Sequence, residues 1–327
     1  MVRALRSRYR ISIGLPAVFL AAALFMVFLS YALPRLLPGD FVTAMYASSN
    51  VTLSEEQEAA LRSYYTSQET FREYLMRWIR LDWGYSYAYM TPVSSLFFEA
   101  LPWTLLLLGS ANLLSLTLGF FLGVEAAWRW DSRGGKWLVG WMTLFEGMPE
   151  MVTGVLLLLI FALHLGWFPA AGAETAYADL SFFKRVADVG HHLALPLLTL
   201  VVAYVPGNFL LTRNSMMIFL RSPFTTTARA KGLSARRVRY AHVARNALLP
   251  LVTRFGLRVS FMVTGALVVE RIHAYPGLGT LLFNAIQARD LPVIQGVVLM
   301  SSLMVLAVIL CLETVYRILD PRIGYAS

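Results

Sequence analysis

Long apolar stretches alternate with short polar ones along the whole chain. Several stretches of 20 or more residues contain no Asp, Glu, Lys or Arg. About 20 apolar residues are enough to cross a hydrocarbon core roughly 30 Å thick. The pattern therefore predicts an all-α membrane protein with six membrane-spanning helices. They are expected at residues 11–34, 100–124, 137–168, 189–212, 247–269 and 291–312.

These spans divide the chain into four parts. The first part, residues 1–34, holds a basic tail and the first helix, which we expect to be retained rather than cleaved as a signal peptide. Residues 35–99 form a loop after that helix, residues 100–320 hold the other five helices, and residues 321–327 form a second tail. Within the five-helix core, the loop 213–249 is the most basic segment.

The basic residues also predict the orientation of the chain. Lys and Arg accumulate on the cytoplasmic side of a membrane. Of the 28 basic residues, 19 fall on the side that carries both termini and the 213–249 loop. We therefore expect both termini in the cytoplasm and the 35–99 loop outside.

The external loop contains eight acidic and five basic residues and has a helical pattern from Leu53 onward. Ser54 is a plausible N-cap for that helix, with Glu56 and Glu58 in its first turns, where the helix dipole favours anions. Two interpretations stay open: an interfacial helix that only packs, or a surface under a docked partner. Pro102, which opens the second apolar run, is expected to mark a helix start. The same applies at three other runs, to Pro196, Pro250 and Pro292.

The basic loop has a recognisable internal order. Ser222 and Pro223 favour the N-cap and first position of a helix, and Gly232 can adopt the left-handed conformation that ends one. Ser234 can cap a second helix that stops at Pro250. The segment 222–236 is thus predicted to be an ordered elbow, a helix, a glycine break and another helix.

Two functions are compatible with such an elbow. Ten basic residues and no acidic ones lie between residues 212 and 258. The small residues Ala228 and Ala230, flanked by arginines, would let the tip enter a groove of another protein. Alternatively, the bases bind anionic headgroups, at about 1 kcal/mol each. Because headgroup binding alone does not require an ordered elbow, we favour docking.

Two acidic residues interrupt the third apolar stretch. Glu146 and Glu150 are four residues apart, hence on one helical face, and ionisable groups at membrane depth face a cavity or a partner. Gly147 and Pro149 between them are expected to break the helix. Glu146, Pro149 and Glu150 are therefore candidates for a translocation path that favours cationic groups. A structural ion pair is the alternative, with three candidate partners: Arg213, Arg254 and Arg258.

Several kinds of chemistry lack their motifs. The sequence contains no GxxxxGK[ST] phosphate loop, no HExxH and no GxSxG, so we expect neither ATP hydrolysis nor other catalysis in this chain. The lone Cys311 excludes a disulfide framework. Adjacent His191 and His192 point about 100° apart on a helix, so we predict no metal site.

The basic loop, TARAKGLSARRVRYAHVARNALLP, resembles the cytoplasmic loop of permeases from the bacterial dipeptide/oligopeptide/nickel ABC importer family. Further similar segments follow in family order: RLLPGDFV, LGWFPAAG, VVERIHAYPGLGTLL, RDLPVIQGVVL and LDPRIG. The resemblance covers nearly the whole chain and implies a type I importer permease fold in a prokaryotic plasma (inner) membrane. It implies ATP-driven import of a small solute, with di- or oligopeptides favoured over nickel chelates or sugars. An ion-coupled secondary transporter is the competing interpretation.

The resemblance also implies partners and sites. The partners are a second permease subunit, two ATPase subunits that carry ATP and Mg, and an extracytoplasmic substrate-binding protein. The elbow corresponds to the coupling helix that docks onto the ATPase, with nine residues carried over: Pro223, Thr226, Ala228, Arg229, Ala230, Lys231, Gly232, Leu233 and Arg236. Four residues match an external gate: Glu270, Pro276, Gly277 and Gly279. The sequence departs from the general motif in having Thr226 where a glutamate is usual, and the acids of FEGMPEM are unusual in the third span.

Overall fold

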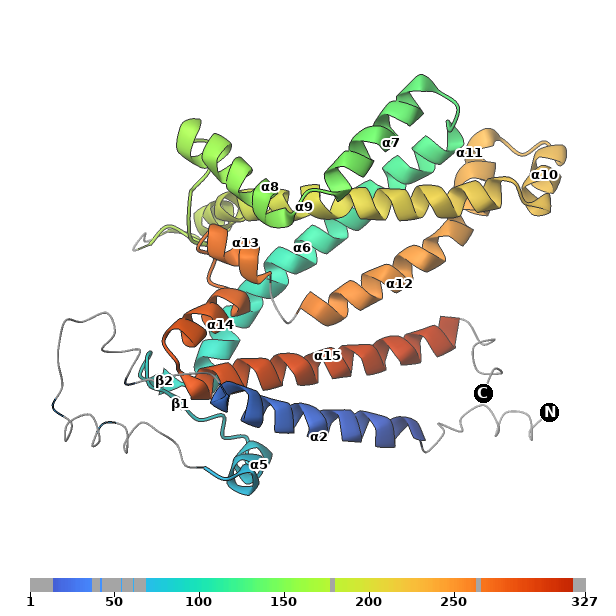
Figure 1. Ribbon diagram of the computed structural model, residues 1–327. Helices are drawn as coiled ribbons and strands as arrows, with labels where there is room; N and C mark the ends of the chain where they lie inside the picture. Colours follow the sequence, from blue (N-terminus) through green and yellow to red (C-terminus); the bar gives the residue numbers. More distant parts are fainter. Residues whose placement is uncertain are drawn as a thin grey trace. The chain divides into compact units, whose positions relative to one another are not determined.

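The computed structural model describes residues 14–36, 69–176, 180–262 and 266–319, together with residues 42, 54 and 61. The described chain is almost entirely helical (Figure 1). It forms two compact units. The described residues up to Glu99, with those from Leu281 onward, make up the first unit, and Ala100–Thr280 make up the second. The predicted tails 1–10 and 321–327, and most of the loop before residue 69, lie outside the described residues.

The first unit is built around two helices. Helix α2 (Gly14–Arg35) packs against α15 (Leu291–Leu319), and the short helix α5 (Phe71–Ile79) packs against α2. An antiparallel hairpin follows, with β1 (Tyr85–Ser86) paired to β2 (Thr91–Pro92), in the register Tyr85 opposite Pro92.

Helix α5 is held at its start and along one face. Thr70 and Glu73 form a capping box: the Thr70 N–H donates to Glu73 Oε2 at 2.8 Å, and the Glu73 N–H donates to Thr70 Oγ1 at 3.4 Å. Further along, the fully buried Tyr74 places its hydroxyl 2.9 Å from Ser30 Oγ on α2. The helical character predicted within the 35–99 loop is thus confirmed for this segment.

The second unit contains the two longest helices, α6 (Val93–Trp128), which begins in the first unit, and α9 (Phe182–Leu220). A stripe of small residues brings them together. A Cβ on Gly123 would lie 2.8 Å from the Phe209 carbonyl oxygen, and one on Gly119 would lie 2.5 Å from Asn208 Cβ. One turn earlier, Ser115 accepts a hydrogen bond from Asn208 Nδ2 at 3.2 Å. Small residues four apart allow the close backbone approach common between membrane helices.

The third predicted span is broken as the sequence predicts. Helix α7 (Arg133–Glu146) ends at Gly147, and α8 (Glu150–Leu157) begins after Pro149 and continues as the π-helix η2 (Leu158–His164). The two halves are bent by 98°. Both α7 and α8 pack against α9.

The basic loop and the segments after it form a series of short helices. These are α10 (Pro223–Ala230), α11 (Ala235–Arg237), the π-helix η3 (Val238–Ala244) and α12 (Arg245–Met262). They are followed by α13 (Leu267–Ile272) and α14 (Leu278–Gln287).

Within the described residues, three helices are long and apolar enough to cross a membrane, namely α6, α9 and residues 291–311 of α15, or four if the bent pair is one span. Two predicted spans fall short by this measure. In α2 the described apolar stretch is Val18–Leu33, and α12 contains Arg245, Arg254 and Arg258.

Three of the four prolines contradict the prediction of helix starts. Pro102, Pro196 and Pro250 lie inside α6, α9 and α12, whereas Pro292 is the second residue of α15. The second elbow helix therefore does not stop at Pro250. The predicted apolar runs cover only part of these helices, and α6 and α9 begin before them, at Val93 and Phe182.

Candidate functional site

The elbow has the predicted order of helix, glycine and helix. Helix α10 begins at Pro223 and ends at Ala230, and Gly232 follows with φ +71°, the left-handed conformation that glycine adopts without strain. The Gly232 N–H donates to the Arg229 carbonyl at 2.9 Å, which closes the turn. Ser222 stands at the N-cap, but its hydroxyl donates to the Phe219 carbonyl at 2.6 Å instead of capping α10.

One face of the elbow is part of the chain's own core. Ala228 is only 5% exposed and packs in a cluster with Met216, Val238 and Val243. The expectation that Ala228 enters a groove of a partner is therefore wrong, because its side chain faces α9 and η3. The small size of a side chain in a short helix does not distinguish a core-facing from a partner-facing side.

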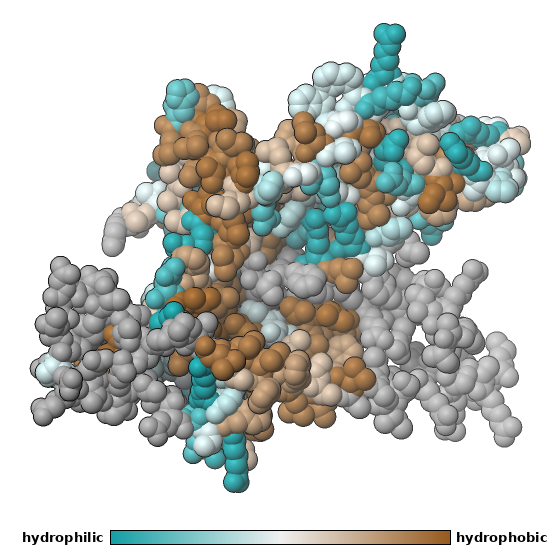
Figure 2. All heavy atoms as spheres, viewed as in Figure 1, coloured by the Kyte–Doolittle hydropathy of each residue, from teal (hydrophilic) through white to brown (hydrophobic). Residues whose placement is uncertain are grey.

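The other face of the elbow is open. Exposed positions include the aromatic ring of Phe224 (39% exposed) and the basic side chains Arg229 and Lys231. Hydrophilic side chains gather over this part of the second unit (Figure 2). Of the other predicted coupling residues, Leu233 is half-buried against the cluster, and the rest are exposed: Pro223, Thr226, Ala230, Gly232 and Arg236.

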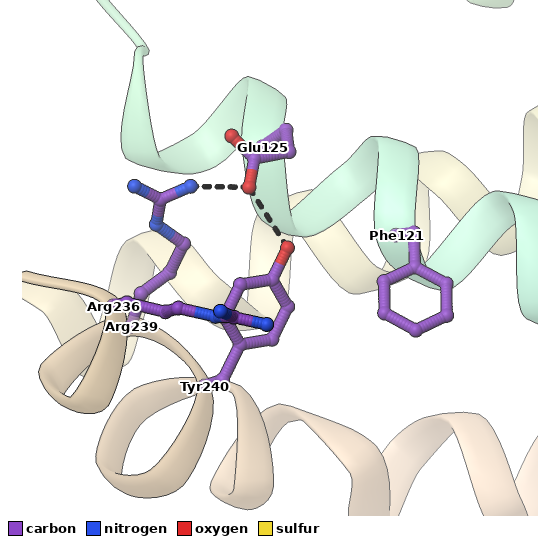
Figure 3. Close-up of a pocket in the computed structure, with 5 residues that line it drawn as sticks. All are labelled: Phe121, Glu125, Arg236, Arg239 and Tyr240. Carbon is purple, nitrogen blue, oxygen red and sulfur yellow. Dashed lines mark hydrogen bonds and ion pairs between the residues drawn. The ribbon is translucent and has the colours of Figure 1, made fainter.

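A carboxylate on α6 fastens the elbow to that helix. Glu125 Oε1 accepts a hydrogen bond from the Tyr240 hydroxyl at 2.8 Å and is paired with the Arg239 guanidinium (Figure 3). Its second oxygen lies 3.8 Å from Arg129 Nε. Burial, followed by the hydrogen bond to Glu125, raises the pKa of Tyr240, so its hydroxyl remains a donor at neutral pH.

The indole of Trp128 adds a second attachment. The Arg239 guanidinium lies 4.9 Å and that of Arg229 lies 5.3 Å from its ring centroid, within the range of cation–π attraction. Arg229 belongs to α10, the first arm of the elbow. Arg239 belongs to η3, which continues the second arm from α11. The end of α6 therefore contacts both arms. The elbow and a long apolar helix are thus in direct contact at Trp128.

The acidic residues of the broken span have basic neighbours. Glu146 Oε1 lies 3.9 Å from Arg254 Nη2, and Arg254 Nη1 donates to the Gly207 carbonyl at 3.0 Å. This is one of the ion pairs that the sequence left open as the alternative to a path role. Of the other two candidate partners, Arg258 lies 4.0 Å above the Tyr204 ring, and Arg213 donates to Asn214.

Gly207 makes room for that ion pair. A Cβ there would lie 2.8 Å from Glu146 Oε1 and would also meet the Arg254 guanidinium. Because Gly207 lies in α9, Glu146 at the end of α7 and Arg254 in α12, the pair joins three helices at the break in the third span. Its side chains are 40% and 32% exposed, so it is open to solvent or to a solute.

The predicted gate residues lie around a buried network of hydrogen bonds centred on Glu270, the Glu270 knot. Glu270 is fully buried, and its carboxylate accepts hydrogen bonds from the Thr104 hydroxyl at 2.8 Å and from the Thr280 N–H at 3.1 Å. The same Thr104 oxygen accepts from the Leu278 N–H at 2.8 Å. The turn before α14 is thus tied to α6 through one carboxylate and one hydroxyl.

The glycines of the gate motif are explained by this carboxylate. A Cβ on Gly277 would collide with the Glu270 carboxylate, and one on Gly279 would lie 2.6 Å from Leu267 Cα. Pro276, between the buried Tyr275 and Gly277, is exposed. The two glycines of the motif therefore allow the turn before α14 to pack closely against the Glu270 carboxylate.

The structure groups the predicted residues into three separate sets of contacts: the elbow, the acidic break and the Glu270 knot. Sequence reasoning missed the residues that connect the elbow and the Glu270 knot to α6, which are Glu125, Trp128 and Thr104. Glu125 and Trp128 could have been found, because an acid and a tryptophan directly follow the second apolar run and the chain also contains a strongly basic loop. No signal in the sequence pointed to Thr104, since a threonine within an apolar helix is common.

The chain was compared with known proteins. Residues 115–325 match the family described as binding-protein-dependent transport system inner membrane component. The chain is 35% identical to the oligopeptide transport system permease protein AppB of Bacillus subtilis (strain 168), covering 91% of this chain and 93% of that protein. It is 32% identical to the di/tripeptide transport system permease protein DppB of Pseudomonas aeruginosa (strain UCBPP-PA14), covering 91% and 93%.

A further relative is the peptidoglycan transport system permease protein YejB of Agrobacterium fabrum (strain C58 / ATCC 33970), at 34% identity over 78% of this chain and 71% of that protein. The family match spans well over half of the sequence, and it includes the elbow, the Glu146–Arg254 pair and most of the Glu270 knot. The chain is a multi-pass membrane permease component and belongs to the family of binding-protein-dependent transport system inner membrane components.

Proposed function

We propose that this permease carries di- or oligopeptides as one subunit of an ATP-driven importer. The names of the relatives support the solute class, because two relatives that each cover 91% of the chain are named as oligopeptide and di/tripeptide permeases. We further propose the type I importer fold with six spans, in which α2 and α12 also cross the membrane. Both termini then lie in the cytoplasm of a prokaryotic cell, as the distribution of basic residues favours.

The single observation that carries the proposal is the ordered elbow with one face in the chain's own core and the other open. We propose that the open face docks onto an ATPase subunit. A complete importer then contains two such ATPases with their ATP and Mg, a second related permease and an external substrate-binding protein.

The proposed mechanism follows from the attachments of the elbow. A partner can drive a conformational change only if it binds the two states with different affinity. When the ATPase subunits close on ATP, they would pull α10, and the contacts of Arg229 and Arg239 with Trp128 would transmit the pull to α6. The membrane helices would then alternate between outward-open and inward-open arrangements.

The remaining predicted residues receive positioning roles in this mechanism. We propose that Glu146, Pro149 and Glu150 line the path at the break of the third span, with Arg254 holding Glu146. The Glu270 knot, with Pro276, Gly277 and Gly279, would hold the external gate in shape. The gate would move as a unit with the outer part of α6, because Thr104 joins them.

Charge reversal at the tip of the elbow tests the proposal. We expect Lys231→Glu to abolish co-purification of the ATPase subunit and uptake of a labelled dipeptide in cells that produce the complete importer. The matched control is Lys184→Glu, the same change at an exposed position near the start of α9. ATPase binding that survives Lys231→Glu unchanged would contradict the docking role.

The solute class is tested separately. Competition of dipeptide uptake by unlabelled dipeptides, a nickel chelate and a disaccharide should show displacement by peptides alone. Displacement by the chelate or the sugar would assign the importer to another solute of the family without affecting the docking result.

A further inference from the structure

A cavity lies where the elbow meets α6. Five residues line it: Phe121, Glu125, Arg236, Arg239 and Tyr240 (Figure 3), and its volume is about 460 Å³. Two of them come from α6, and three come from α11 and η3. All five belong to the second unit.

The charge of the cavity favours an anion. Glu125 is engaged by Arg239 and Tyr240 and has Arg129 close to its second oxygen. Arg236 is exposed and pairs with none of the other lining residues. Its planar guanidinium can bind two oxygens of a phosphate at once.

The surface that leads into the cavity is apolar. On α6, Leu114, Leu118 and Phe121 are 43%, 45% and 51% exposed and lie on the same helical face as Glu125. This stripe runs along a helix long enough to span a membrane and ends at the cavity. A soluble phosphate would make no use of it, whereas an acyl chain would cover it and remove it from water.

We propose that the cavity binds the headgroup of an anionic phospholipid, with the phosphate on Arg236 and an acyl chain along Leu118 and Phe121. The lipid is placed between α6 and the arm of the elbow that contains Arg239. Its headgroup would therefore stabilise the attachment of the elbow to α6, and coupling would depend on the anionic lipid content of the membrane. The inference goes beyond the proposed function and holds whichever solute is carried.

Lipid binding to the purified full-length permease tests the proposal, with phosphatidylglycerol and phosphatidylcholine titrated separately and counted by native mass spectrometry. We expect a preference for phosphatidylglycerol that Arg236→Gln weakens about fivefold, the effect of one basic residue near an anionic surface. Arg237→Gln is the matched control, because Arg237 is equally exposed but does not line the cavity. Thermal unfolding of both variants in detergent verifies that they are folded.

Two further measurements separate the source of the phosphate. Phe121→Ala should also weaken phosphatidylglycerol binding, while inorganic phosphate at the same concentration should not displace the lipid. Equal losses in Arg236→Gln and Arg237→Gln, or displacement by inorganic phosphate, would overturn the lipid site. So would complete release of the lipid when the ATPase subunits bind, since the cavity would then belong to the protein docking surface.

Discussion

At the scale of single residues, packing around buried acids gives the most direct tests. Gly277 has no room for a side chain, because a Cβ would collide with the Glu270 carboxylate. We expect Gly277→Ala to lower the free energy of unfolding by about 1–3 kcal/mol, the usual cost of overpacking. The measurement is the thermal unfolding of the purified permease in detergent.

Gly140→Ala is the control for that change. Gly140 lies within α7 and has no atom within 4 Å of an added Cβ, so alanine should be neutral or slightly stabilising there. If the two variants unfold at the same temperature, the Glu270 knot does not have the rigidity assigned to it.

The contact between Glu146 and Arg254 gives a second prediction at this scale. Because the pair is partly exposed, we expect a coupling energy of at most about 1 kcal/mol in a double-mutant cycle of Glu146→Gln and Arg254→Gln. Uptake distinguishes the path role from a purely structural pair. If Glu146 lines the path, Glu146→Gln should reduce uptake of a cationic dipeptide more than uptake of a neutral one. Equal reductions would mean that Glu146 serves only in the structural ion pair with Arg254.

At the scale of elements, the start of α5 predicts a dependence on pH. The hydrogen bonds that Thr70 gives from its backbone and its side chain lower the pKa of Glu73 below its ordinary value of 4.5. A lowered pKa in the folded state means that the carboxylate stabilises the helix above pH 4.5, and that this stabilisation is lost as the pH falls through the lower folded value. Amide hydrogen exchange in α5, corrected for its intrinsic rate, should therefore become faster as the pH falls below the ordinary pKa of 4.5 and through the lower folded pKa of Glu73.

Thr70→Ala removes both side-chain bonds of the capping box and serves as the comparison. In this variant α5 should exchange faster at neutral pH, and the additional change on acidification should shrink. If exchange in Thr70→Ala responds to acid as it does in the wild type, a group other than Glu73 causes the pH dependence.

The elements differ in how far the sequence predicts them. The break between Glu146 and Glu150 and the left-handed Gly232 were predicted, because glycine and proline act locally on the backbone. The true lengths of α6 and α9 were not, since polar residues extend a helix beyond its apolar core without any signal in hydropathy. The same limit explains Ala228: spacing identifies the residues that share a face, and only the fold determines what covers that face.

The candidate site was predictable to the same degree. The exposed basic tip follows from composition and turn chemistry. Its attachment to Glu125 and Trp128 does not, because those contacts join residues more than 100 positions apart and depend on how α6 and α9 pack. Ser115, Gly119 and Gly123 set that packing, and they read in the sequence as ordinary small residues of a membrane helix.

At the scale of the whole molecule, the proposed coupling predicts that the attachment of the elbow to α6 determines whether ATP hydrolysis moves the membrane helices. Glu125 holds Arg239 and Tyr240 together, so its loss should loosen the elbow without removing the exposed face for which we propose docking. We expect Glu125→Gln to retain the ATPase subunits and to lower dipeptide uptake several-fold. ATP hydrolysis should fall less, so more ATP is consumed for each peptide imported, as measured in proteoliposomes.

Glu99→Gln provides the matched control, because Glu99 is an exposed acid near the other end of the same helix. It should leave the ratio of ATP to peptide unchanged. If Glu125→Gln instead released the ATPase, Glu125 would act in docking and not in transmission. If it left uptake and hydrolysis at wild-type levels, the Trp128 contacts alone would suffice to carry the pull from the elbow to α6, since they engage both arms without the carboxylate.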